Sequence, residues 1–250
     1  MTSNSAHDPT PQSPQSIEDI MASFEVENAP LPDGDTGEGL KFHTNRGDFN
    51  AIIHRAIGHK SPGAQQAVIW VCGARGGFGG PGPGTYAKLA EQFVSKGITS
   101  LRLDYRLPND IMECVFDLLS GVAYCKRTGH GPVVVVGHSF GGAVVVAAGA
   151  NSAHIKGVVS LSPQTAGAAM AGALAPRKLL VVHGKADTRL PFRCAEMIYE
   201  WAKEPKELVL YDGAEHRLEE CRDELESLLT TWIPNTLEEN IDVPEIELKQ

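Results

Sequence analysis

The chain has 250 residues, 42% of them hydrophobic, and a formal net charge of −9. This length and composition predict one large core, since α/β folds of this size often form a single domain. The negative charge argues against nucleic acid or an anionic membrane as a partner, and no stretch is apolar for long enough to cross a bilayer.

The N-terminal part is expected to be separate from this core. Residues 1–15 are rich in Ser, Pro, Gln and Thr, which is typical of disorder. A short helix is expected next, because four apolar residues share one helical face: Ile17, Ile20, Met21 and Phe24. Together with the turn-rich linker that follows, residues 1–38 are interpreted as a disordered tail with a short helix.

From residue 39 the pattern alternates between strands and helices. The expected strands lie at 40–44, 50–56, 67–72, 98–103, 133–137, 155–161, 178–183 and 207–211. The later ones are continuous Val, Ile and Leu runs, as in a parallel sheet that is covered on both faces. The alternation predicts a doubly wound α/β domain over 39–233, with a mostly parallel eight-stranded sheet flanked by helices.

Apolar residues recur at helical spacing between these strands. Helix 141–150 is apolar all round and should therefore be buried. We expect Asn109 to cap one helix, Pro191 to begin another and Pro234 to end the last one. Residues 234–250 then form an acidic C-terminal tail.

The segment Gly137-His138-Ser139-Phe140-Gly141 is a G-x-S-x-G motif between a strand and a helix. In this context the motif predicts a nucleophile elbow, a tight turn that holds the serine at positive φ. Glycines on both sides give the room that such a turn needs. The motif therefore indicates an enzyme in which the serine hydroxyl attacks carbonyl carbon.

A serine nucleophile needs a histidine to accept its proton and an acid to orient that histidine. After such an elbow, the acid comes first in the chain and the histidine second. Of the later histidines, His154 lies at the wrong edge of the sheet, and His183 precedes the acid that it would need. His216 follows the strand at 207–211, immediately before the last helix, so we assign it as the base.

The acid is assigned to Asp187, which follows the strand at 178–183. Asp212 is nearer to His216 in sequence, but it adjoins a strand end and is interpreted as a turn residue. Glu215 is adjacent to the histidine and would point elsewhere. Because single loop residues of these types are common on surfaces, the assignment depends on the order of all three residues after successive strands.

Two backbone N–H groups are needed to stabilise the oxyanion of such a reaction. We expect one from Phe140, directly after the serine, and one from Ala74 in the glycine-rich loop 72–77. Short loops should form the substrate pocket. The candidate side chains are Arg75, Phe78, His138, Gln164 and Thr165.

The elbow, His-Gly-Lys-Ala-Asp at 183–187 and Gly-Ala-Glu-His at 213–216 together resemble the α/β-hydrolase family, and the resemblance covers residues 67–232. It implies the serine, aspartate and histidine named above as nucleophile, acid and base. The chain is most similar to the compact dienelactone hydrolase-like group, because the segment 162–186 is too short for a cap domain. Dienelactone hydrolases carry cysteine at the nucleophile, where this chain has serine, and many relatives have His-Gly where it has Cys72-Gly73.

We therefore expect a serine hydrolase that cleaves a small or flexible carboxylic ester through an acyl-enzyme, with a small-molecule acyl substrate and water as reactants. An acyltransferase, a thioesterase or an amidase would use the same residues, and a non-catalytic binding protein on this fold is a further alternative. The run 77–82 matches the dinucleotide-binding fingerprint G-x-G-x-x-G, but Pro81 removes an N–H that a pyrophosphate needs. The sequence indicates neither a metal nor an organic cofactor.

The five cysteines are odd in number and include no C-x-x-C pair, so no disulfide framework is expected. This usage fits a reducing compartment. No basic stretch precedes an apolar block near the N-terminus, so we expect no signal peptide and a cytoplasmic location. The sequence leaves the oligomeric state open.

Overall fold

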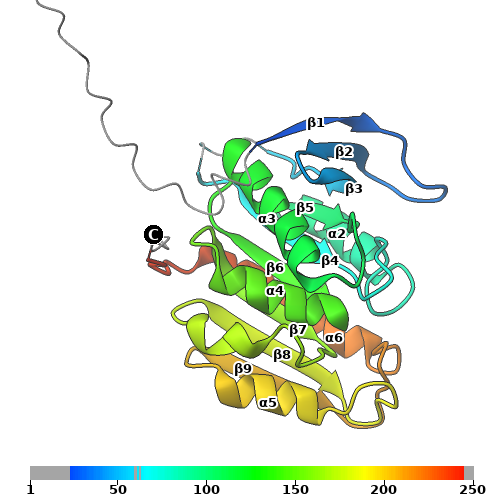
Figure 1. Ribbon diagram of the computed structural model, residues 1–250, viewed down its shortest axis with the longest axis vertical. Helices are drawn as coiled ribbons and strands as arrows, with labels where there is room; N and C mark the ends of the chain where they lie inside the picture. Colours follow the sequence, from blue (N-terminus) through cyan, green and yellow to red (C-terminus); the bar gives the residue numbers. More distant parts are fainter. Residues whose placement is uncertain (1–22, 59–60, 62, 245–250) are drawn as a thin grey trace, which may run out of the picture.

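The structure is a computed structural model that describes residues 23–58, 61 and 63–244. Its strands are β1 Phe24–Ala29, β2 Glu38–Thr44, β3 Gly47–His54, β4 Gln66–Val71, β5 Ile98–Leu103, β6 Val133–His138, β7 Ile155–Leu161, β8 Lys178–Gly184 and β9 Lys206–Tyr211. In this part of the chain they form one nine-stranded sheet in the order β1-β2-β3-β5-β4-β6-β7-β8-β9 (Figure 1). Strands β4 to β9 run parallel to one another. Strand β1 pairs antiparallel with β2, β2 with β3, and β3 with β5.

Helices cover both faces of the sheet. They are α2 Thr85–Ser95, α3 Ile111–Arg127, α4 Phe140–Ala150, α5 Arg193–Trp201 and α6 Arg222–Glu238, with a short 3₁₀ helix η1 at Ala169–Ala173. Figure 1 shows α3, α4 and α5 in front of the sheet and α2 and α6 behind it. Each face has its own cluster of buried apolar side chains. Because helices cover both faces, the central strands β5, β6 and β7 are buried along their whole length. This burial explains their continuous apolar runs.

The structure confirms the predicted mostly parallel sheet and the eight strands from β2 to β9, and it adds β1 at the edge. The count of eight strands is therefore wrong by one. Phe24, predicted on a helix, begins β1 instead and packs against Phe42, with the ring centroids 5.4 Å apart. The sheet thus begins before residue 39, and the rest of the predicted N-terminal helix lies outside the described residues.

Three helix boundaries differ from the prediction. The smallest difference is at α5, which begins at Arg193, two residues after Pro191. Asp110 caps α3 in place of Asn109, because its carboxylate accepts the N–H groups of Met112 and Glu113, each at 3.1 Å. The last helix, α6, continues through Pro234 to Glu238. It continues because Leu237, beyond the proline, is buried against the sheet. The first residues of the predicted acidic tail are therefore helical.

The connections at the carboxyl edge of the parallel strands are short. Between β7 and β8 the chain forms only η1, so the described residues include no cap domain over this edge. None of the helices in the described ranges is long and apolar enough to cross a membrane. The loops that follow β4, β6, β8 and β9 consequently meet at an edge that no inserted domain covers.

Candidate active site

Ser139 is the single residue between β6 and α4. Its φ of 58° and ψ of −117° lie outside the regions that L-residues prefer, so close packing must hold it there. A Cβ on Gly137 would lie under 3.0 Å from the Gly141 carbonyl, and a Cβ on Gly141 would lie equally close to the Cys72 carbonyl. Only glycine fits at both positions, as the motif predicts.

Side chains from three loops form one hydrogen-bonded chain. Ser139 Oγ lies 2.9 Å from His216 Nε2, and His216 Nδ1 lies 2.7 Å from Asp187 Oδ2. Asp187 lies in the loop after β8 and His216 in the loop after β9, and these two strands are parallel neighbours in the sheet. Because the carboxylate accepts the Nδ1–H, Nε2 presents its lone pair to the serine hydroxyl. The sequence-predicted set of three residues is thus brought together.

The Asp187 carboxylate is fully buried and well supplied with donors. Its Oδ1 accepts the N–H groups of Arg189 at 2.8 Å and Leu190 at 2.9 Å. Burial by itself raises the pKa of Asp187, but donation from Leu190, His216 and Arg189 outweighs it, so the pKa lies below its usual value. The carboxylate is therefore ionised at neutral pH.

His183 is a residue that sequence reasoning set aside and that the structure brings to the site. Its fully buried side chain donates from Nε2 to Asp187 Oδ2 at 2.9 Å and to the Leu190 carbonyl at 3.1 Å. Burial lowers the pKa of His183, so the ring is neutral. Its Nδ1 has no partner within the described part of the chain. The available signal was its place at the end of β8, four residues before the acid.

His138 supports His216 from the other side. Its Nε2–H donates to the backbone carbonyl of His216 at 2.9 Å, and the two ring centroids are 5.0 Å apart. Burial lowers the pKa of His138 to about 4. The ring therefore stays neutral and serves as a fixed donor at physiological pH.

The depressed pKa of His138 predicts a pH dependence of stability. The pKa of this histidine is 6.5 in the unfolded chain and about 4 in the folded protein. Between these two pH values the unfolded chain binds a proton at His138 and the folded protein does not. The free energy of unfolding should therefore decrease toward low pH, by up to about 1.4 kcal/mol per pH unit from this residue. His138→Gln keeps an N–H donor but cannot titrate. Urea unfolding between pH 7 and 5 should show a shallower decrease for this variant, and equal slopes would contradict the assignment.

A cavity of about 370 Å³ opens beside Ser139. Arg75 and His138, which the sequence predicted for the pocket, line this cavity together with Ala74, the predicted oxyanion donor. Three other predicted pocket residues lie elsewhere. The Phe78 ring faces the Arg102 guanidinium beside a different cavity, the Gln164 amide donates to the Ala166 carbonyl at 2.9 Å, and the Thr165 carbonyl accepts the N–H of Ala168. None of the three is among the residues that line the cavity beside Ser139, so the structure does not support their assignment to it.

Arg189 and Arg217 join Arg75 around this cavity, and no acidic side chain of the described residues lines it. Arg217 also donates to the Pro81 carbonyl at 3.2 Å and pairs with Glu219 at 3.0 Å. Sequence reasoning missed Arg217 as a pocket residue, although it directly follows the predicted base. The rim of the cavity is therefore positively charged, in contrast to the chain as a whole.

The glycine-rich run that resembled a dinucleotide fingerprint forms another part of the rim, through Gly79, Gly80 and Pro81. Asp104, at the position of the acidic residue in that fingerprint, accepts the Gly77 N–H at 2.6 Å. Its carboxylate therefore ties this loop to the end of β5. The run is a structural part of the serine site.

Comparison with known proteins agrees with this architecture. Residues 61–245 match the Alpha/beta hydrolase family, and the chain belongs to this family. An acetyl xylan esterase from Paenibacillus sp. R4 has a similar structure, with a TM-score of 0.67 and 14% identity over 87% of this chain and 92% of that chain. A dienelactone hydrolase from Anabaena variabilis has a TM-score of 0.63 and 18% identity over 85% of this chain and 98% of that chain. At these identities the similarity concerns the fold alone.

Sequence similarity to a relative is confined to a short segment. The Uncharacterized protein YfhR of Escherichia coli K12 is 46% identical to the chain over 43 residues. This segment spans 17% of the chain and 15% of the length of that relative. It adds no information about a substrate.

Proposed function

We propose that the protein is a serine hydrolase that cleaves small carboxylic esters through an acyl-enzyme. The observation that carries the proposal is the unbroken hydrogen-bonded chain from Ser139 through His216 to the buried carboxylate of Asp187. Membership of the alpha/beta hydrolase family supports hydrolysis as the general chemistry. The free thiols of all five cysteines support a reducing location such as the cytoplasm.

The proposed reaction has two steps. His216 Nε2 takes the hydroxyl proton of Ser139 as Oγ attacks the carbonyl carbon, and ionised Asp187 stabilises the imidazolium that forms. The imidazolium then gives its proton to the leaving alcohol, which leaves the acyl group on the serine. In the second step the neutral histidine accepts a proton from water, whose oxygen attacks the acyl carbon, and returns this proton to the serine as the acid leaves.

The oxyanion of both steps is proposed to accept two backbone N–H groups. Phe140 supplies one from the first position of α4, where the helix dipole is positive. Ala74 supplies the other from the loop after β4, which lines the same cavity as the serine. Backbone donors need no particular side chain, so alanine at this position is sufficient.

A series of p-nitrophenyl esters of rising acyl length tests the proposed substrate class. A cavity of about 370 Å³ without a cap should favour acetate and butyrate, with a burst of p-nitrophenol when deacylation is the slower step. The Ser139→Ala variant measures the background. Turnover confined to long acyl chains would contradict the proposal, as would equal rates for the variant.

The three arginines at the cavity predict a preference for an acyl chain that ends in a carboxylate. A mono-p-nitrophenyl ester of succinate should have a higher kcat/KM than the uncharged butyrate ester, and the ratio should fall with added salt because charges near the surface are screened. Arg75→Gln and Arg189→Gln should reduce this ratio and spare butyrate turnover. A ratio that neither salt nor these variants change would argue against a role for the rim charges.

We also infer that His183 is a positioning residue for Asp187. His183→Leu removes one hydrogen bond to a buried charge, which is worth about 1.5–3 kcal/mol, so kcat should fall by about tenfold or more with little change in KM. His183→Gln can present an amide N–H and should recover part of the rate. Equal losses in both variants, or a loss in KM alone, would indicate that the residue only supports packing.

A further inference from the structure

The acid and the base of the serine site lie on separate loops. The acid loop, residues 185–190, follows β8 and contains Asp187, and the base loop, residues 212–217, follows β9 and contains His216. The bond of 2.7 Å between His216 Nδ1 and Asp187 Oδ2 therefore depends on the position of one loop relative to the other. Because catalytic groups must lie within about 0.5 Å of the productive geometry, the contacts between these loops matter for the reaction.

Backbone hydrogen bonds join the two loops on the near side of the acid. The N–H of Lys185 donates to the Tyr211 carbonyl at 2.9 Å, and the N–H of Ala186 donates to the Ala214 carbonyl at 3.0 Å. Within the described residues, no backbone bond joins these loops beyond Asp187. A connection on the far side of the acid must therefore come from a side chain.

The Glu215 carboxylate provides this connection. Its Oε2 accepts the N–H of Thr188 at 3.0 Å and the Thr188 hydroxyl at 3.1 Å. The same oxygen accepts the N–H of His216 at 3.4 Å. One oxygen thus contacts both the residue that follows the acid and the base itself. Hydrogen bonds to a carboxylate are stronger than those between neutral groups, so a single side chain can hold the two loops together here.

Glu215 is itself held in place from the base loop and the segment that follows. Its backbone N–H donates to Glu220 Oε2 at 3.0 Å, and its carbonyl accepts the N–H of Leu218 at 2.9 Å. The residue is half-buried and does not line the cavity beside Ser139. Its effect on the reaction therefore passes through the two loops rather than through contact with a substrate.

We propose that Glu215, as part of the serine-hydrolase function proposed for this site, is a positioning residue that clamps the acid loop to the base loop. Ala186 on one side of the acid and Thr188 on the other then both bind the base loop, so Asp187 is fixed between two connections. Loss of the second connection should let the acid move relative to His216. A displacement of about 1 Å can lower a rate by about 100-fold.

Two conservative variants separate the length of this side chain from its charge. Glu215→Asp keeps the carboxylate but is one methylene too short to retain both contacts with Thr188, whereas Glu215→Gln keeps the length and an oxygen that can accept. For p-nitrophenyl acetate we expect kcat to fall by about tenfold or more in Glu215→Asp, with KM within about twofold, and by no more than about threefold in Glu215→Gln. A loss in Glu215→Gln that equals or exceeds the loss in Glu215→Asp, or a change confined to KM, would overturn the proposal.

Asp212→Asn is the matched control for the contact between the loops. Asp212 belongs to the same loop as Glu215 and binds the acid loop through an exposed ion pair with Lys185 at 2.8 Å. Exposed ion pairs contribute little, so kcat of this variant should stay within about twofold of the original value. A loss of kcat as large as that of Glu215→Asp would overturn the proposal.

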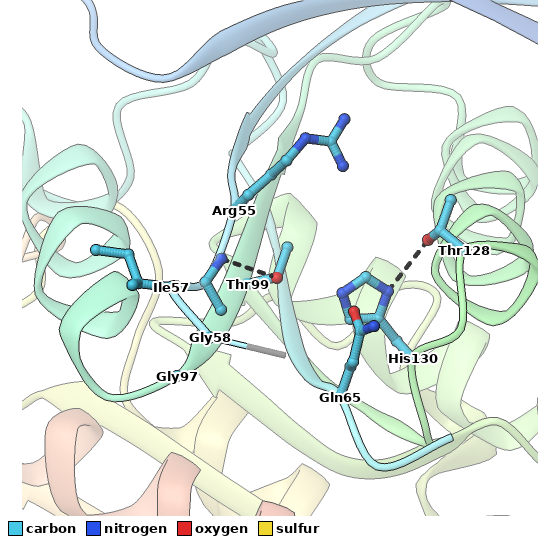
Figure 2. A pocket seen from close by; sticks show the side chains of 9 residues that line it. Arg55, Ile57, Gly58, Gln65, Gly97, Thr99, Thr128 and His130 are labelled. Carbon is cyan, nitrogen blue, oxygen red and sulfur yellow. Dashed lines mark hydrogen bonds between the residues drawn. The ribbon is translucent and has the colours of Figure 1, made fainter. Parts of the chain in front are cut away.

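Thr128→Val is the control for a general loss of stability. The Thr128 hydroxyl lies 3.1 Å from His130 Nδ1 and donates to the Tyr124 carbonyl at 2.8 Å, before β6 and thus at the edge of the sheet opposite to Ser139 (Figure 2). Its removal should lower the free energy of unfolding in urea and leave kcat within about twofold, because distant sites act independently. If kcat falls in proportion to stability in both this variant and Glu215→Asp, the clamp is refuted.

A measurement without turnover separates the role of Glu215 from the proposed ester hydrolysis. The proton between His216 Nδ1 and Asp187 should give a low-field NMR signal in the free protein, identified by its absence in His216→Ala. In Glu215→Asp this signal should move upfield and exchange faster with solvent, and in Asp212→Asn it should not change. These shifts would support the clamp even if the protein hydrolysed none of the esters tested. An identical signal in Glu215→Asp and the original protein would overturn the clamp even if ester hydrolysis were observed.

Discussion

Replacing Ser139 with alanine should lower kcat/KM for a short ester by about three to six orders of magnitude and leave the fold intact. The reason is that Ser139 Oγ, 2.9 Å from His216 Nε2, is the proposed nucleophile, and the oxyanion donors alone would retain only a small residual rate. Initial rates with p-nitrophenyl acetate, together with circular dichroism and a urea unfolding curve, measure both parts of this prediction.

Two further variants sharpen this test. His216→Ala should cost about as much as Ser139→Ala, and the double variant should be no worse than either, because residues that act as one unit are not additive. Ser95→Ala is the control, since the hydroxyl of this exposed serine at the end of α2 donates to the Gln92 carbonyl, and the variant should retain full activity. A Ser139→Ala enzyme within about tenfold of the original rate would refute the assigned nucleophile.

Replacing Gly141 with alanine should destabilise the protein by about 3 kcal/mol or more, or prevent folding. The added Cβ would lie under 3.0 Å from the Cys72 carbonyl and 3.1 Å from the Tyr105 hydroxyl, which itself donates to that carbonyl at 3.2 Å. Both neighbours are fixed at the carboxyl edge of the sheet, so neither can move without loss of contacts. Urea unfolding measures the change.

Gly79→Ala is the control for this prediction. Gly79 also lies in a loop of the site, but a Cβ there would have no neighbour within 4 Å, and its backbone is not in the left-handed region. Its unfolding free energy should change by no more than about 0.5 kcal/mol. Equal unfolding free energies for the Gly141→Ala and Gly79→Ala variants would contradict this prediction. They would mean that Gly141 does not approach the Cys72 carbonyl as closely as the structure shows.

The features that the sequence predicts well are those with local signals. Continuous apolar runs indicate strands that are buried on both faces, and the G-x-S-x-G motif indicates a turn in which only glycine fits. The order of Asp187 and His216 after successive strands then brings both to the same edge, because parallel strands end together. For these reasons the fold and the hydrogen-bonded set of three residues could be predicted from the sequence.

The features that the sequence did not predict depend on contacts between distant segments. Strand β1 has only a short apolar alternation, and it is defined by pairing with β2 and by the packing of Phe24 on Phe42. Phe78 was expected near the serine, but the bond from Gly77 to Asp104 sets the path of its loop. His183 was rejected as the base on chain order, although the fold of the acid loop makes it a second donor to Asp187.

Reaction with an activated serine-directed phosphonate tests the central claim most directly. The folded protein should gain one phosphonyl group, and mass spectrometry of its peptides should place this group on Ser139. The Ser139→Ala variant should gain none, and His216→Ala should react far more slowly, because the serine then has no base at 2.9 Å. A folded protein that does not react, or an adduct on any other residue, would contradict the assignment of Ser139 as the nucleophile.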